Sequence, residues 1–512
     1  MLLPTVLSSR QRIRAIVFLF GLVAACKLPA QTATAQDGRP NILLILVDDL
    51  RPAIGAYGDT LAITPHLDQL AARSLQFERA YSNQAVCAPS RYNLMLGSRS
   101  TSSGIYGFGR DFRDPYPDAT TLPQFFKAQG YHAESMGKVF HIGHDTYNDT
   151  ASWSVPHHQE LVIEYVDPAS KPEGDTREEA LFSNQGWDYA RSLPRGPAWE
   201  APDVPDDAYA DGRIATRALS RLAALNAQSD RPFFLAVGFA RPHLPFSVPK
   251  RYWDLYDENQ LPLPGEENVH PKNAPPYAVK YGDEIDQYTP VPQTVTKEPF
   301  ADSLARKLIH GYYASTSYVD AQIGKVLEGL RTLGLDENTI VVLWGDHGYM
   351  LGELGMWTKH VNYELANRIP LLIAGPGIAP ARTMHLVETV DIFPTLVELA
   401  GFQRPVVSQP FDGISLARLS ADANTSLRDH AYHCFPRGGR MGRAIRTDRY
   451  RMVEWKNMND PSDVEYELYD YDGGLVERRN IAAEQPEVLA KLQAILRRHP
   501  EAMHQRPPSQ RN

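Results

Sequence analysis

The chain is poor in cysteine. Only Cys26, Cys87 and Cys434 occur among its 512 residues, and no two of them form a C-x-x-C pair. This excludes a disulfide framework and a zinc knuckle. If Cys26 belongs to an export segment, the mature chain can form at most one disulfide, between Cys87 and Cys434.

Long runs of one charge and long apolar runs are absent as well. The formal net charge is -9 at pH 7, with 52 basic against 61 acidic residues. No basic run supplies the electrostatic footprint of nucleic-acid binding. No apolar run reaches the roughly 20 residues of a membrane-spanning helix. The motifs G-x-S-x-G, G-x-x-x-x-G-K-[ST] and H-E-x-x-H are also missing, so the corresponding hydrolases, nucleotide-binding proteins and metalloproteases fit poorly.

The N-terminus has the pattern of an export signal. Three arginines precede an apolar run from Ala15 to Ala25, and an A-x-A cleavage motif ends at Ala35. We therefore predict a signal peptide over residues 1–35 and a secreted or periplasmic protein. The residues before Cys26 also match a lipobox, so a lipoprotein anchored through Cys26 is the alternative.

Two continuous apolar runs predict buried strands. Ile42 to Val47 and Thr339 to Trp344 have the pattern of strands covered on both faces, as in a parallel sheet. Phe233 to Phe239 and Pro370 to Ala374 are further candidates. Between them, residues 301–333 repeat apolar side chains at helical spacing. This alternation predicts an α/β fold.

Further signals predict shorter elements. Thr64-Pro65 should begin a helix, and a helix from Val387 to Ala400 should end at Gly401. Strand-like pieces at Arg443 to Arg451 and Glu465 to Tyr471 precede a terminal helix.

From this organisation we predict a catalytic domain at 36–425 and a small C-terminal subdomain at 426–512. Proline-rich stretches at 111–120, 156–206 and 257–300 are expected to be surface insertions. They should lie over the edge of the sheet where the strands end.

Acidic residues follow two of the predicted buried strands. Asp48-Asp49 follows the first and Asp346-His347 follows the second. A lone acidic pair is usually a helix cap with a solvated neighbour. The carboxyl ends of parallel strands meet at one edge of a sheet, however, and three carboxylates there favour Ca²⁺ or Mg²⁺. His347 is a softer donor, which alone would favour a transition metal.

Cys87 stands in the segment Cys87-Ala88-Pro89-Ser90-Arg91. Pro89 predicts a helix start, which would place Cys87 at the positive end of a helix beside Arg91. Such surroundings lower a thiol pKa and bind anions. The segment is thus a reactive-thiol or oxyanion site, or else Cys87 is simply a buried, inert residue.

Basic residues cluster in three short segments. They are Gly137-Lys138-Val139-Phe140-His141, Arg241-Pro242-His243 and Lys359-His360. Each one alone is more often a solvated base or a structural histidine. Together, in loops near the same sheet edge, they suit a tetrahedral anion.

These motifs together resemble one family. C-A-P-S-R matches C-x-P-S-R, the signature of type I sulfatases, and R-P-N-I-L-L-I-L-V-D-D-L, T-P-H-L-D-Q-L-A and Y-E-L-Y-D are similar to other sulfatase blocks. G-K-V-F-H, R-P-H-L-P-F, G-D-H-G and W-T-K-H are most similar to the iduronate-2-sulfatase type. The resemblance implies an alkaline-phosphatase-like fold: a large mixed sheet sandwiched by helices, then a small antiparallel C-terminal sheet.

The resemblance also implies roles for the site residues. A formylglycine-generating enzyme would oxidise Cys87 to formylglycine, whose hydrate attacks the ester and is stabilised by Arg91. That residue and four others would hold Ca²⁺ in preference to Mg²⁺: Asp48, Asp49, Asp346 and His347. Lys138, His243 and Lys359 would bind the sulfate. His243 or Lys359 would protonate the leaving sugar oxygen, and His141 would remove the second hydroxyl proton.

The function that follows is exo-type removal of sulfate from a sulfated polysaccharide or oligosaccharide, with a 2-O-sulfated uronic acid as the leading substrate. Lys359 and His360 would meet the sugar carboxylate. Two alternatives are a phosphodiesterase or phosphonate hydrolase on the same scaffold, and a non-catalytic sulfoglycan-binding protein. The chain departs from the family pattern at Met95-Leu96-Gly97-Ser98, after the signature, and at residues 471–477.

Overall fold

The computed structural model describes residues 38–171, 174–228, 230–265 and 270–509. The predicted signal peptide and Cys26 lie outside the described residues. Residues Arg39–Asn512 form one compact unit, and the elements below all belong to it.

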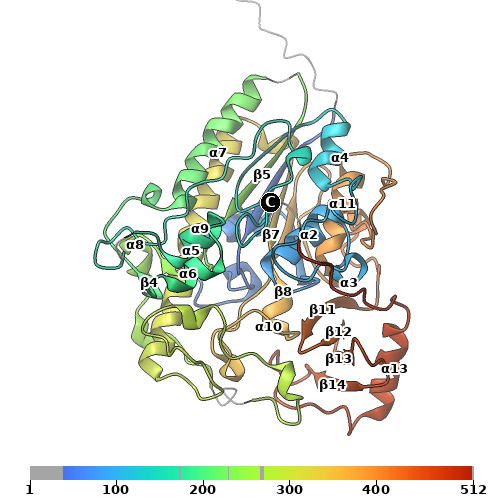
Figure 1. Ribbon diagram of the computed structural model, residues 1–512. Helices are drawn as coiled ribbons and strands as arrows, with labels where there is room; N and C mark the ends of the chain where they lie inside the picture. Colours follow the sequence, from blue (N-terminus) through green and yellow to red (C-terminus); the bar gives the residue numbers. More distant parts are fainter. Residues whose placement is uncertain (1–37, 172–173, 229, 266–269, 510–512) are drawn as a thin grey trace, which may run out of the picture. The chain divides into compact units, whose positions relative to one another are not determined.

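A mixed sheet of eight strands lies at the centre of this unit (Figure 1). Its strands are β1 (Asn41–Val47), β2 (Leu75–Tyr81), β3 (His132–Gly137), β5 (Phe233–Phe239), β7 (Thr339–Gly345), β8 (Arg368–Ile369), β9 (Leu371–Ala374) and β10 (Ala381–Glu388). They are ordered β10-β2-β9-β7-β1-β5-β3, with β8 paired to β2. Strands β7, β1, β5 and β3 are parallel, whereas β9 runs antiparallel to β7. The four strands predicted for this sheet are all present, as β1, β5, β7 and β9.

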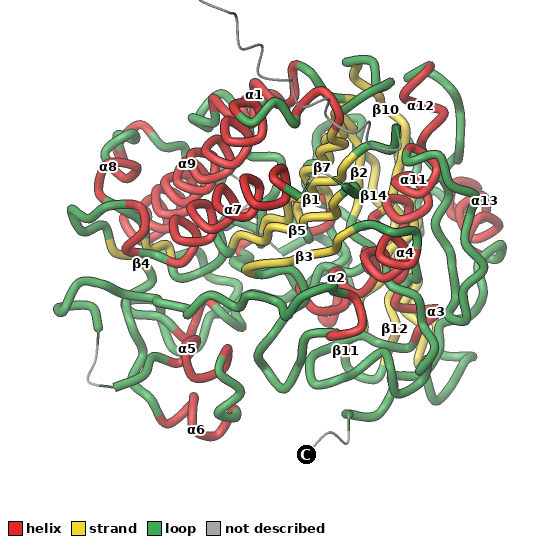
Figure 2. The backbone as a smooth tube through the Cα atoms, turned by 90° about the horizontal axis from the view of Figure 1, so that it is seen from above, coloured by secondary structure: helices red, strands yellow, loops and turns green. Residues whose placement is uncertain are grey.

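Helices cover both faces of the sheet (Figure 2). One face is covered by α1 (Pro65–Ala72), α7 (Ala210–Ala227) and α9 (Asp302–Thr332). The other is covered by α2 (Cys87–Leu96), α4 (Leu122–Ala128), α11 (Ile392–Leu399) and α12 (Ala417–Ala421). The inner strands β1, β5 and β7 are buried over their whole length. Because both of their faces meet helices, these strands can be almost entirely apolar.

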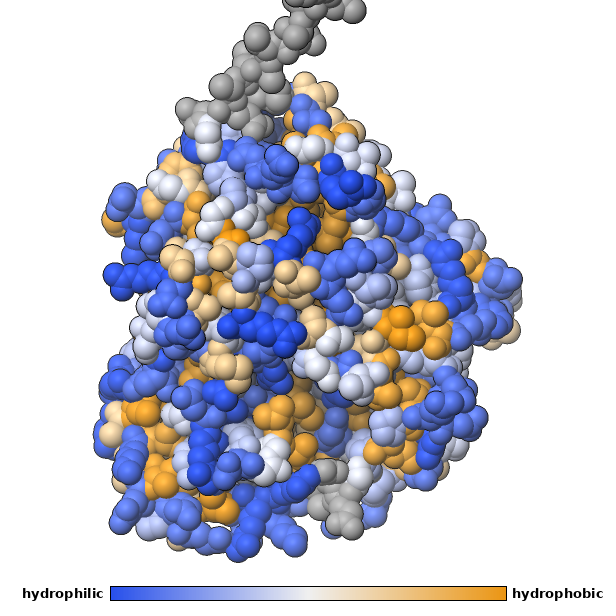
Figure 3. Space-filling view, turned by 180° about the vertical axis from the view of Figure 1, so that it is seen from behind, coloured by the Kyte–Doolittle hydropathy of each residue, from blue (hydrophilic) through white to orange (hydrophobic). Residues whose placement is uncertain are grey.

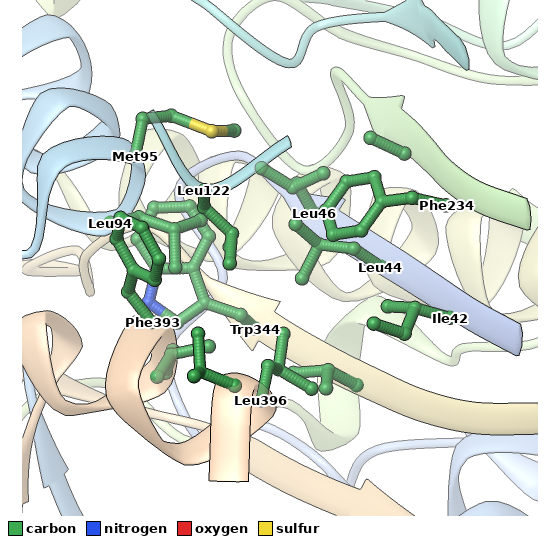
Figure 4. Packing of buried hydrophobic residues seen from close by; sticks show 14 of the residues in the cluster. Ile42, Leu44, Leu46, Leu94, Met95, Leu122, Phe234, Trp344, Phe393 and Leu396 are labelled. Atoms are coloured by element: carbon green, nitrogen blue, oxygen red, sulfur yellow. The ribbon is translucent and has the colours of Figure 1, made fainter. Parts of the chain in front are cut away.

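Strand β1 shows this two-sided packing. Ile42, Leu44 and Leu46 point toward α2, α4 and α11, whereas Leu43 and Ile45 pack with α1, α7 and α9. Figure 4 shows the first set in contact with side chains of neighbouring strands and helices. All five are fully buried, and each contributes roughly 1.5–3 kcal/mol by leaving water.

A second, antiparallel sheet follows near the C-terminus, as predicted (Figure 1). It consists of β11 (Ala431–Arg437), β12 (Arg440–Arg446), β13 (Tyr450–Asn457) and β14 (Val464–Asp470), and α13 (Pro486–Leu496) packs on it. The strand predicted at 443–451 is in fact parts of β12 and β13. They are joined by a turn that the hydrogen bond from Thr447 N to Tyr450 O closes (2.8 Å). The domain boundary at 425/426 remains a proposal and falls between α12 and β11.

The helix predicted from Val387 to Ala400 begins later than expected. Val387 and Glu388 end strand β10, where they pair with Ala80 and Tyr81 of β2. α11 starts only at Ile392, so sheet pairing overrides the helical pattern over the first residues. Gly401 follows the helix with φ +83°, a left-handed conformation that glycine adopts without strain.

The remaining elements are short and lie mainly in the connections. They are α3 (Ser100–Ser103), α5 (Arg177–Phe182), α6 (Trp187–Ser192), α8 (Lys250–Trp253), α10 (Glu364–Asn367), β4 (Trp199–Glu200) and β6 (Phe246–Ser247). Short 3-10 helices are η1 (Gly55–Tyr57), η2 (Thr150–Ser152), η3 (Asp206–Ala208), η4 (Glu258–Gln260), η5 (Pro276–Ala278), η6 (Ile285–Gln287), η7 (Asp336–Asn338), η8 (Glu353–Gly355) and η9 (Thr389–Asp391).

The surface is mixed in character. On the face shown in Figure 3, hydrophobic residues lie in several separate patches between hydrophilic ones. Among the helices of the described residues, none combines the length and the apolar character needed to cross a membrane.

Candidate active site

The acidic residues predicted to lie together do so, at the carboxyl ends of β1 and β7. These strands pair in parallel, with Val47 opposite Gly345, so Asp48-Asp49 and Asp346-His347 emerge side by side. The backbone N–H of Asp49 donates to Asp346 Oδ1 at 3.0 Å. Asp49 has φ +57°, a left-handed conformation that is uncommon outside glycine and frequent at functional sites.

The side chains of this cluster could hold a metal ion. Ligand atoms of Asp48, Cys87, Asp346 and His347 lie within 4.8 Å of one another. His347 Nδ1 contacts Gly348 O at 3.0 Å, which leaves Nε2 facing the cluster, 3.2 Å from Cys87 Sγ and 3.5 Å from Asp49 Oδ1. Asp49 belongs to an overlapping group with Asp48, Cys87 and His243. The predicted metal ligands therefore lie around one buried region, in two groups that share Asp48 and Cys87.

Two basic side chains balance part of the acidic charge. Arg91 Nη2 lies 2.9 Å from both Asp48 and Asp346, and Lys138 forms a close ion pair with Asp48. Burial by itself raises the pKa of Asp48, but Lys138 and Arg91 outweigh it and hold that pKa well below its ordinary value. Burial and the charge of Asp48 raise the pKa of Asp346 well above its ordinary value. A further positive charge at this point would stabilise the ionised cluster.

Cys87 is the first residue of α2, as Pro89 predicted, and it is buried. The predicted lowering of its thiol pKa is wrong: burial and the negative charge of Asp48 raise that pKa well above its usual value. The guanidinium of Arg91, which was expected to favour the thiolate, pairs with the carboxylates of Asp48 and Asp346. Cys434 is also buried and free, so no disulfide joins the two cysteines.

A cavity of about 810 Å³ opens onto Cys87. It brings together five of the predicted site residues: Cys87, His141, His243, Lys359 and His360. The predicted insertions 156–206 and 257–300 supply much of the remaining wall, whereas 111–120 supplies none of it. Arg91 and Lys138 lie behind this wall, against the acidic cluster.

Glu284 links two of these residues and was missed from the sequence. Its carboxylate lies 2.8 Å from His243 Nε2 and 2.9 Å from Lys359 Nζ. Lys359 also lies 2.9 Å from Asp49. Burial by itself raises the pKa of Glu284, but His243 and Lys359 overcome this and hold it well below its ordinary value. Nothing distinguishes Glu284 from the other acids of the proline-rich stretch 257–300 in the sequence.

The histidines of the cavity have partners that hold their rings. His141 Nε2 lies 3.0 Å from His144 Nδ1, and Phe108 packs against both rings with centroids 4.8 and 5.1 Å away. Burial and the charge of Lys138 lower the pKa of His141 well below its ordinary value. His360 Nδ1 lies 2.6 Å from Asp283. The motif F-H-I-G-H contains His144 three residues after His141, a spacing that could have revealed it.

Comparison with known proteins identifies the family of the chain. The family model described as sulfatase matches residues 40–402. The chain belongs to the sulfatase family. A second model, described as the C-terminal part of N-sulphoglucosamine sulphohydrolase, matches residues 352–505. This sulfatase is therefore a sulfuric ester hydrolase with an alkaline-phosphatase-like fold.

Individual relatives agree with the family. The chain is 33% identical to iduronate 2-sulfatase of Mus musculus over 515 residues, covering 88% of this chain and 90% of the relative. It is 35% identical to iduronate 2-sulfatase of Homo sapiens over 399 residues, covering 71% and 70%. These matches confirm the predicted resemblance to the iduronate-2-sulfatase type. A solved phosphonate monoester hydrolase from Silicibacter pomeroyi, with 24% identity, a TM-score of 0.68 and coverage of 90% and 95%, shares the fold.

Proposed function

We propose that this sulfatase removes the 2-O-sulfate of a uronic acid at the end of a sulfated glycan. The observation that carries the proposal is the position of Lys359 and His360, which line the same cavity as Cys87. A sulfate at position 2 of a uronate lies on the same ring as the carboxylate. A lysine and a histidine beside the reacting centre can bind that carboxylate while the ester meets Cys87. The two iduronate 2-sulfatases among the relatives support the same substrate.

The nucleophile in this proposal is formylglycine, made from Cys87 by a formylglycine-generating enzyme. Its hydrate supplies one hydroxyl to attack sulfur and a second to expel sulfate afterwards. Burial raises the pKa of the unmodified Cys87 thiol, so a thiolate nucleophile at the start of α2 is disfavoured. Arg91, paired with Asp48 and Asp346, would hold the surroundings of this hydrate in place.

The proposed metal is Ca²⁺, with Mg²⁺ as the alternative. Asp48, Asp49 and Asp346 offer carboxylate oxygens, the ligands that hard cations prefer, and His347 and residue 87 complete the set. When bound, the cation would offset the negative charge of the ester and stabilise the charge that develops on sulfate oxygens.

The chain's own side chains would handle the sulfate and the protons. Lys359 and His243 line the cavity and would bind sulfate oxygens, with Lys138 adding positive charge from behind. His243 contacts Leu244 O through Nδ1 and Glu284 through Nε2, which holds its ring in place. In this proposal His243 would donate a proton to the leaving sugar oxygen, a role that Lys359 could also take. His141 Nδ1 has no hydrogen-bond partner among the described residues and would accept the proton of the second hydroxyl.

Sulfate release from a panel of 2-O-sulfated uronate oligosaccharides tests this function. The protein is co-produced with a formylglycine-generating enzyme, and mass spectrometry verifies the conversion of Cys87. We expect release by the parent and background release by Cys87→Ala. Carboxyl-reduced substrates should be desulfated at least about tenfold more slowly, since they lose a charge-assisted contact.

Other results would redirect the proposal. Preferred turnover of phosphonate or phosphate esters by the converted protein would favour the hydrolase alternative. Tight glycan binding without turnover would favour the non-catalytic one. Equal rates on carboxyl-reduced substrates would contradict the uronate assignment alone.

A further inference from the structure

One wall of the cavity is built by α5 and α6, far from the acidic cluster in sequence. This wall is fastened to the loop that carries His141. His144 N donates to Leu181 O at 2.9 Å, and the His144 ring lies 5.2 Å from the ring of Trp187. Gly143, with φ +112°, lets the loop approach so closely that a Cβ there would lie 2.6 Å from the Cα of Phe182. The wall therefore has a defined position relative to the catalytic loop.

Two arginines of this wall line the cavity without an acidic partner. Arg177 donates to the carbonyl of Leu193 at 2.8 Å, and Arg191 lies with Cζ 5.5 Å from the centre of the Trp187 ring. Among the described residues, no ion pair joins either guanidinium to a carboxylate. Trp187, half-buried at the cavity wall, orders the exposed Arg191 by cation–π contact.

The acids nearest the reacting centre are already paired. Glu284 contacts His243 and Lys359, and Asp283 lies 2.6 Å from His360 and 3.1 Å from Lys280. Glu178 of α5 also lines the cavity, but it lies 3.9 Å from His144 Nε2 and pairs with neither arginine. Among the lysines and arginines of the cavity wall, Arg177 and Arg191 are therefore the two that form no ion pair with a described carboxylate. Unpaired arginines beside a cavity favour an anionic ligand, because the guanidinium fork matches sulfate and carboxylate oxygens.

The size of the cavity leaves room for such a ligand. Its volume of about 810 Å³ falls in the range of roughly 300–1,000 Å³ that accommodates drug-sized ligands. One sulfated sugar ring at Cys87 fills only part of it. The next sugar of a glycan would extend along the wall formed by α5 and α6.

From these contacts we propose that Arg177 and Arg191 form a second anion-binding subsite. It binds a sulfate or other anionic group on the sugar next to the one that loses its sulfate. This subsite rests on the proposed function and narrows its substrate class to oligosaccharides that are anionic on two adjacent sugars. Arg191 is its more exposed member, and Trp187 positions it.

Two disaccharides test the subsite. Both carry a 2-O-sulfo-uronate linked to a hexose, and only one carries a second sulfate on that hexose. We expect the parent to prefer the disulfated compound by about tenfold or more in kcat/KM, the effect of one charge-assisted contact. Arg191→Gln should bring this ratio close to one. The preference should also weaken at high salt, which screens exposed charges.

The control is Arg217→Gln, which removes the same charge from the exposed surface of α7, outside the cavity wall. It should leave both rates and their ratio unchanged. Arg177→Gln tests the second member, although its hydrogen bond to Leu193 means that its folding must be checked by circular dichroism. A parent ratio near one, or an unchanged ratio in Arg191→Gln, would overturn the subsite.

Binding to the Cys87→Ala protein separates this proposal from the function on which it rests. Calorimetry should show that the Cys87→Ala protein binds the disulfated compound about tenfold more tightly than the monosulfated one. The Cys87→Ala/Arg191→Gln protein should bind the two compounds equally. Preferential binding without any sulfate release by the parent would overturn the proposed function and retain the subsite. Equal binding of the two compounds, together with sulfate release by the parent, would overturn the subsite and retain the proposed function.

Discussion

Replacement of Glu364 should test what joins the large sheet to the C-terminal sheet. Glu364, on α10, is buried and lies 2.9 Å from Arg446 of β12 and 2.8 Å from Arg451 of β13. Its other oxygen accepts a hydrogen bond from Tyr81, at the end of β2, at 2.8 Å. One carboxylate thus connects the last residue of β2, in the large sheet, to two strands of the second sheet.

The expected loss of stability can be estimated from the charge of the Glu364 carboxylate. Burial by itself would raise the pKa of Glu364, but Arg446 and Arg451 outweigh it and lower the pKa from 4.5 to about 2. Relative to an unfolded chain with the ordinary value, this corresponds to about 3 kcal/mol of stabilisation at neutral pH. Glu364→Gln also leaves two buried guanidinium groups short of negative charge. We therefore expect a loss of about 3–5 kcal/mol, as for other broken buried ion pairs.

Urea unfolding at pH 7, followed by tryptophan fluorescence, measures this loss. The matched control is Glu328→Gln, which removes a carboxylate paired with Arg331 on the exposed face of α9 and should cause no measurable change. Because the pKa of Glu364 is lower in the folded state, its contribution is present above pH of about 4.5 and is lost as the pH falls toward 2. The difference in unfolding free energy between the parent and Glu364→Gln should become smaller over that pH range. A loss at pH 7 no larger than that of the control would refute the reasoning.

Two further predictions concern the active site. Glu284→Gln should lower kcat about 10–100-fold, with a smaller change in KM, because the amide cannot hold both His243 and Lys359 as the carboxylate does. Steady-state kinetics on the 2-O-sulfated substrate measure both constants. An unchanged kcat would show that Glu284 does not position His243 and Lys359. Asp346→Asn should weaken Ca²⁺ binding to metal-depleted protein by about tenfold or more, since it removes one of three carboxylates from the cluster. Calorimetry measures that affinity, and equal affinities of parent and variant would place the metal elsewhere.

The elements with strong local patterns could be predicted from the sequence alone. A short apolar run such as Ile42 to Val47, followed by two acids, is typical of a strand covered on both faces, and its type could be predicted from the sequence. The acids after β1 and β7 could be placed together because parallel strands end at the same edge of a sheet. Cys87 and its proline predicted the start of α2 correctly. For the strand and the helix start, the determining interactions lie within a few residues of one another. The acids lie far apart in sequence, and the general rule for parallel strands places them together.

Other features depend on contacts between distant segments, and only the tertiary structure decided them. The pKa of Cys87 was predicted in the wrong direction because burial and Asp48, 39 positions away in sequence, outweigh the helix start. Glu284 reaches His243 and Lys359 from a proline-rich connection whose path has no periodic signal. The first residues of the predicted helix at 387–400 became strand β10 because β2 offers backbone partners there. Burial, charge pairing and strand pairing are properties of the packed chain, and local sequence patterns cannot report them.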